Sequence, residues 1–266
     1  MHIARKRFGQ HFLQDKLIIQ RIVDAIMPNK DQRIVEIGPG LGALTLPVLK
    51  KSGRLDVVEL DRDLIPDLKA RCAEKGELIV HQADALEFDF GKLATDTQPI
   101  RLIGNLPYNI STPLIFHLLT FAPHIVDMHF MLQKEVADRL SARHGTHAYG
   151  RLSIMVQYFC RVTTLFNVGP ESFNPKPQVD SSIVRFALHR ELPHRANDHD
   201  HFAYIVKTAF AHRRKTLRNC LRTIVSDKDW ENVHIDSQLR PEQLSLSEYV
   251  KLSNALVSEY GNLHDR

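Results

Sequence analysis

The four residues Asn105-Leu106-Pro107-Tyr108 have the types and order needed to hold the exocyclic amino group of a base. The Asn105 side-chain oxygen and the Leu106 carbonyl can both accept a hydrogen bond from such a group. Pro107 removes a backbone donor and stiffens the loop, and Tyr108 offers a flat face on which a base can stack, typically for ~1–3 kcal/mol. In isolation, however, the four residues are explained more simply by an ordinary turn with a packed tyrosine.

A second motif, Glu36-Ile37-Gly38-Pro39-Gly40-Leu41-Gly42, lies upstream, after a short apolar run. Glycines at such a turn let the backbone approach a ligand closely. The G-x-G-x-G spacing differs from the G-x-G-x-x-G of dinucleotide sites, which hold a diphosphate at the helix N-terminus. Glu36 is compatible with S-adenosylmethionine, which has no phosphate, and it could hold the cationic amino-acid end through water.

Two further acids follow later strands in the order expected for this cofactor. Glu59 ends the next apolar strand, 59 − 42 = 17 residues past the last glycine, where a carboxylate can accept from both ribose hydroxyls. Asp84 follows the third strand and could accept from the adenine amino group. A plain turn with solvated strand ends is the alternative, but the ordered series favours methyl transfer from S-adenosylmethionine to a base nitrogen. Catalysis would then come mostly from orientation and exclusion of water.

The elements that must position these residues alternate between apolar runs and amphipathic segments, which predicts an α/β fold with a largely parallel sheet. We expect strands at 33–37, 55–59, 78–81, 101–104 and 128–132, with an antiparallel closing pair at 162–166 and 182–188. Helices are expected at 16–26, 43–51, 64–73, 113–119, 135–141 and 151–159. Ser111-Thr112-Pro113 predicts a helix start with a hydroxyl cap.

The strand pattern ends near residue 190, which divides the chain into two predicted domains. Residues 189–200 are polar and are expected to form a linker. Helices are predicted at 202–211 and 213–225, and a last one begins at Ser245, where Ser245 and Glu248 are spaced as a capping box. We therefore predict a catalytic domain over residues 1–189 and a small all-helical domain over 190–266.

Composition sets limits on the kind of protein. The 266 residues are 43% hydrophobic and 25% charged with a net charge of +4, an ordinary globular balance. Three scattered cysteines argue against a disulfide framework and favour a cytoplasmic setting. No secretory signal or membrane-spanning run is expected, and the histidine pairs lack further ligands, so no metal site is predicted.

The chain resembles the KsgA-type ribosomal RNA adenine dimethyltransferases over nearly its whole length. The resemblance rests on residues 5–13, 36–42, 59–61, 104–113, 131–136, 149–153, 173–181 and 213–216. It implies a Rossmann-like class I methyltransferase domain with a helical C-terminal domain. It also implies dimethylation of N6 on two adjacent adenosines in the 3′-terminal hairpin of small-subunit ribosomal RNA, with four S-adenosylmethionines, by a monomer acting on an assembly intermediate.

The resemblance also implies roles for individual residues. The cofactor would touch His11, Leu13, Gly38, Gly40, Glu59, Asp84 and Asn105. Phe173 would stack on the target adenine opposite Tyr108. Position 11 is often Asn in that family, and His11 can still donate or accept one hydrogen bond.

Two basic segments are candidates for contact with RNA phosphates. Between Lys207 and Arg222 there are six Lys and Arg residues and no acid, although residues 190–266 are nearly neutral (twelve Lys and Arg against eleven Asp and Glu). On a helix, residues 214, 218 and 222 would share one stripe, and a solvated helix face is the alternative. The predicted RNA-binding residues are Arg5, Lys6, Arg7, Arg213, Arg214, Lys215, Arg218 and Arg222.

Three other functions remain as alternatives. A related Erm-type enzyme acting on large-subunit ribosomal RNA would share the fold and the Asn-x-Pro-Tyr loop. A non-catalytic RNA-binding assembly factor could use the same fold, although Gly38, Glu59 and Asn105 are all intact. A nicotinamide oxidoreductase is the weakest choice, because it leaves residues 105–108 unexplained.

Overall fold

The computed structural model describes residues 11–95, 97–212 and 214–260, which form two compact units. The first unit combines the chain up to Ala137 with Arg161–Leu188, and the second combines Asp138–Cys160 with the chain from His189 onward. The predicted division at 189/190 lies one residue from the crossing at 188/189 but assigns 138–160 to the other part. The reason is that α6 (Arg151–Phe159) contacts α7 (His199–Ala209) and α10 (Leu246–Tyr260).

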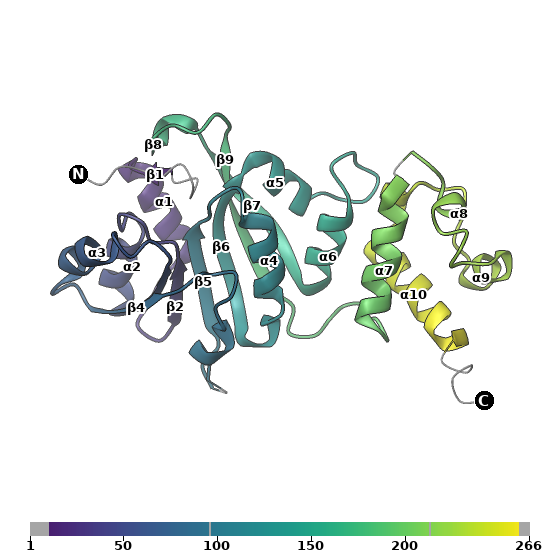
Figure 1. Ribbon diagram of the computed structural model, residues 1–266, viewed down its shortest axis with the longest axis horizontal. Coiled ribbons are helices and arrows are strands. Elements are labelled where there is room, and N and C mark those ends of the chain that lie inside the picture. Colours follow the sequence, from purple (N-terminus) through teal and green to yellow (C-terminus); the bar gives the residue numbers. More distant parts are fainter. Residues whose placement is uncertain (1–10, 96, 213, 261–266) are drawn as a thin grey trace. The chain divides into compact units, whose positions relative to one another are not determined.

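A seven-stranded sheet forms the centre of the first unit, in the order β4-β3-β2-β5-β6-β9-β7 (Figure 1). The first five strands in this order are mutually parallel, and β9 is antiparallel to β6. Every predicted strand is present. The strands are β2 (Arg33–Ile37), β3 (Arg54–Glu59), β4 (Glu77–Gln82), β5 (Ile100–Asn105), β6 (Ile125–Gln133), β7 (Cys160–Val168) and β9 (Ser181–Leu188).

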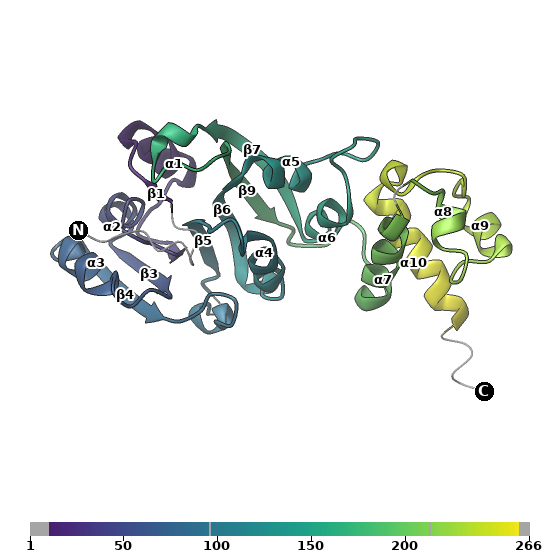
Figure 2. The ribbon, with the colours of Figure 1, turned by 45° about the horizontal axis from the view of Figure 1, so that its top comes forward.

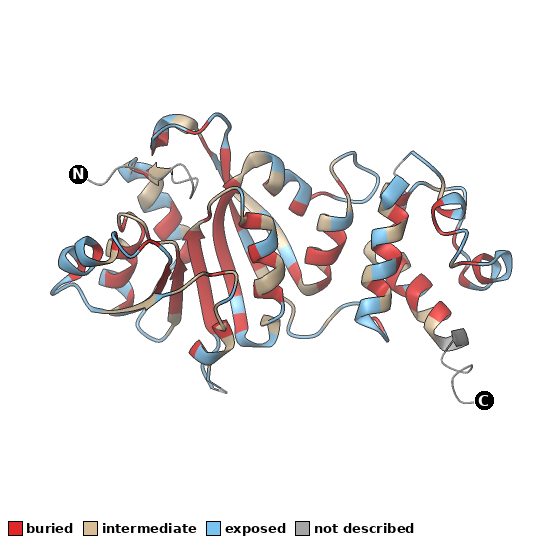
Figure 3. Ribbon diagram, in the orientation of Figure 1, coloured by how far each residue is buried: buried red, intermediate tan, exposed pale blue. Residues whose placement is uncertain are grey.

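The central strands are mostly apolar because helices cover the sheet. In β5, Ile100 to Gly104 are all buried, and the interior strands are almost entirely buried in Figure 3. The α1, α2 and α3 helices share one core with the sheet, through residues such as Ile22, Val48 and Leu68 against Ile34 and Val57. Figure 2 shows α3 beside the edge strand β4.

The helices of the first unit begin and end close to their predicted positions. They are α1 (Lys16–Ile26), α2 (Thr45–Ser52), α3 (Ile65–Cys72), α4 (Ser111–Leu119) and α5 (Lys134–Leu140), which crosses into the second unit. The expected cap at Ser111 is wrong, because Ser111 is the first helical residue. Its hydroxyl donates instead to the Tyr108 carbonyl at 3.1 Å.

A two-stranded antiparallel sheet that the sequence did not predict joins β1 (Phe12–Leu13) to β8 (Phe173–Asn174). Phe12 pairs with Asn174 and Leu13 pairs with Phe173. Leu13 and Phe173 are both buried in the core that α1 and α2 cover. This pairing fixes the N-terminal segment against a loop far along the chain.

The second unit contains α6, α7, α8 (Leu217–Cys220), α9 (Asp227–Val233) and α10. The predicted helix 213–225 is wrong: within its described part only four residues are helical, because Leu217 and Arg218 donate their amides to Leu239 and Ser237. The predicted capping box of α10 is confirmed, since Ser245 and Glu248 bond each other's backbone amides. Short 3₁₀ turns occur at Phe90–Leu93, Ala122–His124, Pro170–Ser172, Phe210–His212 and Pro241–Gln243.

None of the helices in the described part of the chain is both long enough and apolar enough to cross a membrane.

Candidate active site

A pocket of about 280 Å³ opens in the first unit at the carboxyl ends of β2, β3, β4 and β5. Ligands of open α/β sheets bind at this edge, because the loops that follow parallel strands converge there. Ten predicted residues line the pocket together: His11, Leu13, Gly38, Gly40, Glu59, Asp84, Asn105, Leu106, Pro107 and Tyr108. The structure therefore brings two motifs from distant parts of the sequence into one site.

The glycine loop turns sharply out of β2 with a left-handed backbone. Gly38, Gly40 and Gly42 have φ angles of +65°, +55° and +82°, which residues with a Cβ rarely adopt. A Cβ added to Gly40 would lie 3.1 Å from the Phe12 ring, whereas one at Gly38 would meet nothing within 4 Å. The loop thus leaves open space at Gly38 where a ligand can approach the backbone.

Glu59 is held at the end of β3 by backbone donors. Its two oxygens accept from the amides of Asp61 (2.8 Å) and Gly40 (3.2 Å). Burial raises the pKa of Glu59, and these amide donors oppose that rise. A carboxylate has about four acceptor positions, so Glu59 can accept two further hydroxyl donors in the orientation that the backbone fixes.

Glu36, in β2, lines the same pocket and is more deeply buried than Glu59. It is only 2% exposed, and its Oε2 atom has no hydrogen-bond partner among the described residues. Burial, with a smaller contribution from the nearby Glu59 charge, raises the pKa of Glu36 to about 8. The raised pKa favours the protonated form of Glu36 near neutral pH, and the ammonium end of a ligand placed against it would favour the carboxylate instead.

The acids lie along the sheet edge in an order that fits one elongated ligand. Asp84 follows β4, and its Oδ1 accepts from the Leu86 amide at 2.9 Å. Glu59 ends β3, and Glu36 precedes the glycine loop in the neighbouring strand β2. An adenosine with its base toward Asp84 and its ribose at Glu59 would place a cationic tail near Glu36, so these residues fit S-adenosylmethionine.

Asn105 ends β5, and its amide is oriented by a backbone contact. Its Nδ2 donates to the His11 carbonyl at 2.9 Å, which leaves Oδ1 as the acceptor. The preceding Gly104 allows β5 to pass close to β2, because a Cβ there would lie 2.5 Å from the Ile37 oxygen. The Leu106 amide donates to Met131 at 3.2 Å, and this bond fixes the start of the loop.

Tyr108 is anchored at its hydroxyl, which lies 2.7 Å from the Oγ of the buried Ser181. Burial also raises the pKa of Tyr108, so the ring stays neutral. The rings of His11 and Tyr108 stack with centroids 5.6 Å apart and planes 28° apart. Tyr108 thus presents an aromatic ring in a fixed position among the residues that line the pocket.

Phe173, which the family resemblance implies would stack on the target adenine, does not line the pocket in this structure. It is only 3% exposed and belongs to the apolar core. The cause is the β1–β8 pairing, in which Phe173 lies opposite Leu13. Among the described residues, the ring that stacks on Tyr108 is that of His11.

Sequence reasoning missed several residues that shape the site. Ser181 anchors Tyr108, Phe12 packs over Gly40, and the Pro175 carbonyl lies 2.8 Å from His11 Nδ1. The Ser181 and Pro175 contacts join residues 73 and 164 positions apart, so no local sequence pattern predicts them. Ser181 and Pro175 lie inside a segment that carries the family resemblance, which was the one available signal.

The predicted RNA-binding residues are only partly described. Arg5, Lys6, Arg7 and Arg213 lie outside the described residues. Arg214, Lys215 and Arg222 are exposed in turns of the second unit, and Arg218 pairs with Asp227 at 2.7 Å. The expected stripe of residues 214, 218 and 222 is wrong, because the segment is not one continuous helix.

In the described part of the chain, no group of three or more His, Cys, Asp or Glu residues is arranged to hold a metal ion. The three cysteines are buried and free.

Comparison with known proteins supports the fold and the family. Residues 1–257 match the family described as "Ribosomal RNA adenine dimethylase". Proteins named "Ribosomal RNA small subunit methyltransferase A" are 56% identical over 260 residues in Marinomonas sp. (98% of both chains) and over 261 residues in Pseudomonas aeruginosa (98% of this chain and 97% of that one).

Solved structures agree with this grouping. A dimethyladenosine transferase from Plasmodium falciparum has a TM-score of 0.78 and 28% identity, over 95% of this chain and 98% of that one. The 23S rRNA methyltransferase ErmE has a TM-score of 0.73 and 21% identity, over 92% and 99%, a likeness of fold alone. The chain therefore belongs to the ribosomal RNA adenine dimethylase family.

Proposed function

We propose that this protein transfers methyl groups from S-adenosylmethionine to N6 of two adjacent adenosines in the 3′-terminal hairpin of small-subunit ribosomal RNA. The observation that carries the proposal is the amide of Asn105. Its nitrogen is engaged by the His11 carbonyl, its oxygen is left to accept, and it lines one pocket with the acids that fit the cofactor. That arrangement serves an amino group brought to the edge of a cofactor site.

The residues act by binding and orienting rather than by removing a proton beforehand. S-adenosylmethionine supplies an electrophilic methyl group when bound. Glu59 and Asp84 hold the adenosine part, and Glu36 meets the ammonium. Asn105 Oδ1 and the Leu106 carbonyl accept from N6, which favours the tetrahedral nitrogen that attacks, and Tyr108 supports the base. The proton on N6 becomes acidic only after methylation, so alignment provides most of the rate.

The basic residues of the second unit would bind RNA phosphates. Lys207, Arg214, Lys215 and Arg222 are exposed, and exposed cations track a phosphate chain without reading its sequence. The substrate we propose is an assembly intermediate of the small subunit, bound by a monomer in the cytoplasm. Further proposed contacts with the RNA are Arg5, Lys6, Arg7 and Arg213. Phe173 would contact the target adenine only if RNA binding moves β8.

The small-subunit substrate is favoured over the large-subunit alternative by the relatives. Proteins 54–57% identical over at least 95% of this chain bear the small-subunit name, while the large-subunit enzyme shares the fold at 21% identity. A purely structural assembly factor would not require the intact Asn105 and Glu59 arrangement.

The test uses small ribosomal particles that lack the modification. They are incubated with the protein and methyl-labelled S-adenosylmethionine, and the RNA is digested to nucleosides for mass analysis. N6,N6-dimethyladenosine is the expected product. Label on large-subunit RNA instead would move the assignment to the Erm-type enzyme, and bound cofactor with no label on either RNA would support a binding role.

A further inference from the structure

The imidazole of His11 lies on a face of Tyr108. The centroid separation of 5.6 Å and the interplanar angle of 28° fall within the range of favourable aromatic pairs. Both residues line the pocket together with Asn105. The stacked pair therefore belongs to the same pocket as the acceptor that the proposed function gives to the target amino group.

His11 is held by two separate contacts that involve different atoms. Its ring nitrogen Nδ1 lies 2.8 Å from the Pro175 carbonyl. Its main-chain carbonyl accepts from Asn105 Nδ2 at 2.9 Å. The backbone contact does not depend on the ring, so the imidazole can rotate away from Tyr108 while Asn105 keeps its orientation.

A base cannot stack on this face of Tyr108 while the imidazole covers it. We propose that His11 is a competing side chain: its ring covers Tyr108 in the free protein, and the target adenine displaces it on binding. This inference rests on the proposed function and specifies how its base site is filled. Displacement breaks one ring stack and the Nδ1 contact to Pro175, and both re-form when the methylated base leaves.

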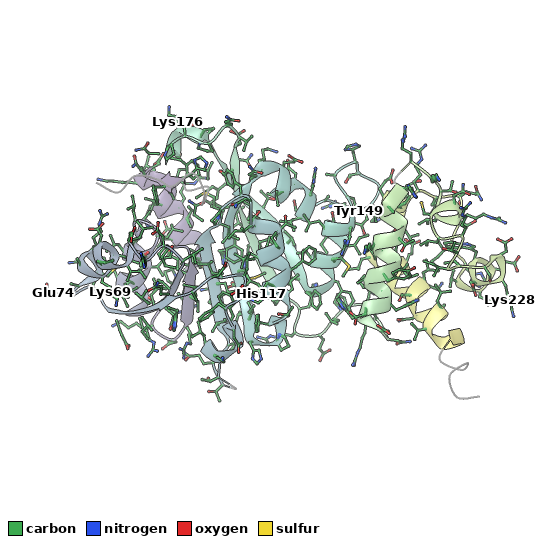
Figure 4. The ribbon with its side chains drawn as sticks, viewed as in Figure 1. Lys69, Glu74, His117, Tyr149, Lys176 and Lys228 are labelled. Carbon is green, nitrogen blue, oxygen red and sulfur yellow. The ribbon has the colours of Figure 1, made fainter. Side chains whose placement is uncertain are left out.

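The competition lowers the affinity for every base by the same factor, because the covered form must first open. The competition therefore changes how fast bases enter and leave the site, not which base is preferred. Two adjacent adenosines must enter this site in turn, and a returning imidazole helps to expel each one. The Pro175 contact lies in an exposed loop beyond β8, from which the neighbouring Lys176 points outward (Figure 4).

The test measures binding of the 3′-terminal RNA hairpin carrying 2-aminopurine at the first target adenosine, without cofactor. Its fluorescence reports stacking of that base on the protein. His11→Asn removes the aromatic cover, and we expect it to bind the base about tenfold more tightly and release it more slowly, since the ring stack on Tyr108 no longer competes. His11→Phe keeps a ring on Tyr108 and should stay within about threefold of the wild type. Equal affinity and release for the wild type and His11→Asn would overturn the proposal.

A measurement on the unaltered chain guards against variants that fold poorly. With histidine labelled at Cε1, the His11 signal, assigned by its loss in His11→Asn, should shift as the unlabelled hairpin is added, because the ring leaves Tyr108. An unmoved signal at saturation would overturn the proposal. Either failure leaves the proposed function standing if the wild type still produces dimethyladenosine, and loss of that product refutes the proposed function instead.

Discussion

The pocket and the basic segment, residues 207–222, hold their functional side chains in opposite ways. In the pocket, Glu59, Asn105 and Tyr108 are each fixed by a hydrogen bond to another part of the chain. In the basic segment, Arg214, Lys215 and Arg222 are exposed on turns. A small ligand must be aligned at defined angles, whereas a phosphate chain responds to the number of charges near it. The loss of activity in pocket variants should therefore depend on which atom is removed. The loss of RNA affinity in variants of the basic segment should depend on how many charges are removed.

The largest effect is expected for Asn105→Ala, which deletes the acceptor for N6. We expect kcat/KM to fall by roughly 10²–10³, as when one oriented hydrogen-bonding group of a transition state is lost. The fall should be the same at low and high salt, measured with saturating cofactor. Thermal unfolding within a few degrees of the wild type is the control, and near-normal turnover would remove Asn105 from the mechanism.

Replacing Arg214, Lys215 and Arg222 together by Ala tests the other side of the comparison. Each lost phosphate contact should lower the slope of log affinity against log salt by roughly 0.7–0.9, so the RNA affinity should fall by about two orders of magnitude near 0.1 M salt. The loss should shrink as salt rises. Lys50, Lys51 and Lys69, cations of the first unit, provide the matched triple variant. An unchanged slope would refute the phosphate role.

Glu59→Ala should weaken cofactor binding by ~1.5–3 kcal/mol, because hydrogen bonds to a charged group are lost. Isothermal titration at fixed salt measures this directly. Glu77→Ala, at the start of the neighbouring strand β4, removes a 61%-exposed carboxylate and should leave the affinity unchanged. If Glu59→Ala behaves like Glu77→Ala, the ribose assignment fails.

The smallest effect concerns Glu36, whose pKa is raised from 4.5 to about 8 in the folded protein. Between these values the folded state keeps a proton that the unfolded state has lost, so stability should fall as pH rises. The wild type should lose up to about 1.4 kcal/mol per pH unit relative to Glu36→Gln. Denaturant unfolding of both proteins at pH 5.5, 6.5 and 7.5 compares them, and parallel curves would contradict the prediction.

Local patterns predicted most of the first unit. The predicted bounds of β2 and α1 match the structure, as do those of α6 in the second unit, because buried strands and amphipathic helices carry their signals within a few residues. The prediction of a helix over 213–225 was wrong because tertiary contacts overrode the periodicity: the amides of Leu217 and Arg218 donate to carbonyls of the 237–239 segment. Helix α9 was missed, although Ser226 and Asp229 form a capping box at its start.

Ten of the residues that line the pocket were predicted, but the contacts that connect them were not. Strand ends placed the glycine loop, Glu59, Asp84 and Asn105 together, since parallel strands share one carboxyl edge. The pairing of β1 with β8 was not predicted, because two-residue strands have no periodicity. That pairing moved Phe173 into the core and left His11 beside Tyr108.

The same pairing has a consequence for how the chain is made. Phe12 and Asn174, partners in β1 and β8, are separated by 162 residues. During translation the sheet strands β2 to β6 emerge from the ribosome long before β8. Strand β1, which follows His11, therefore cannot form its pairing until residue 174 has emerged. The nascent chain can therefore form its glycine loop early, but the base side of the pocket is completed only near the end of translation of the first unit.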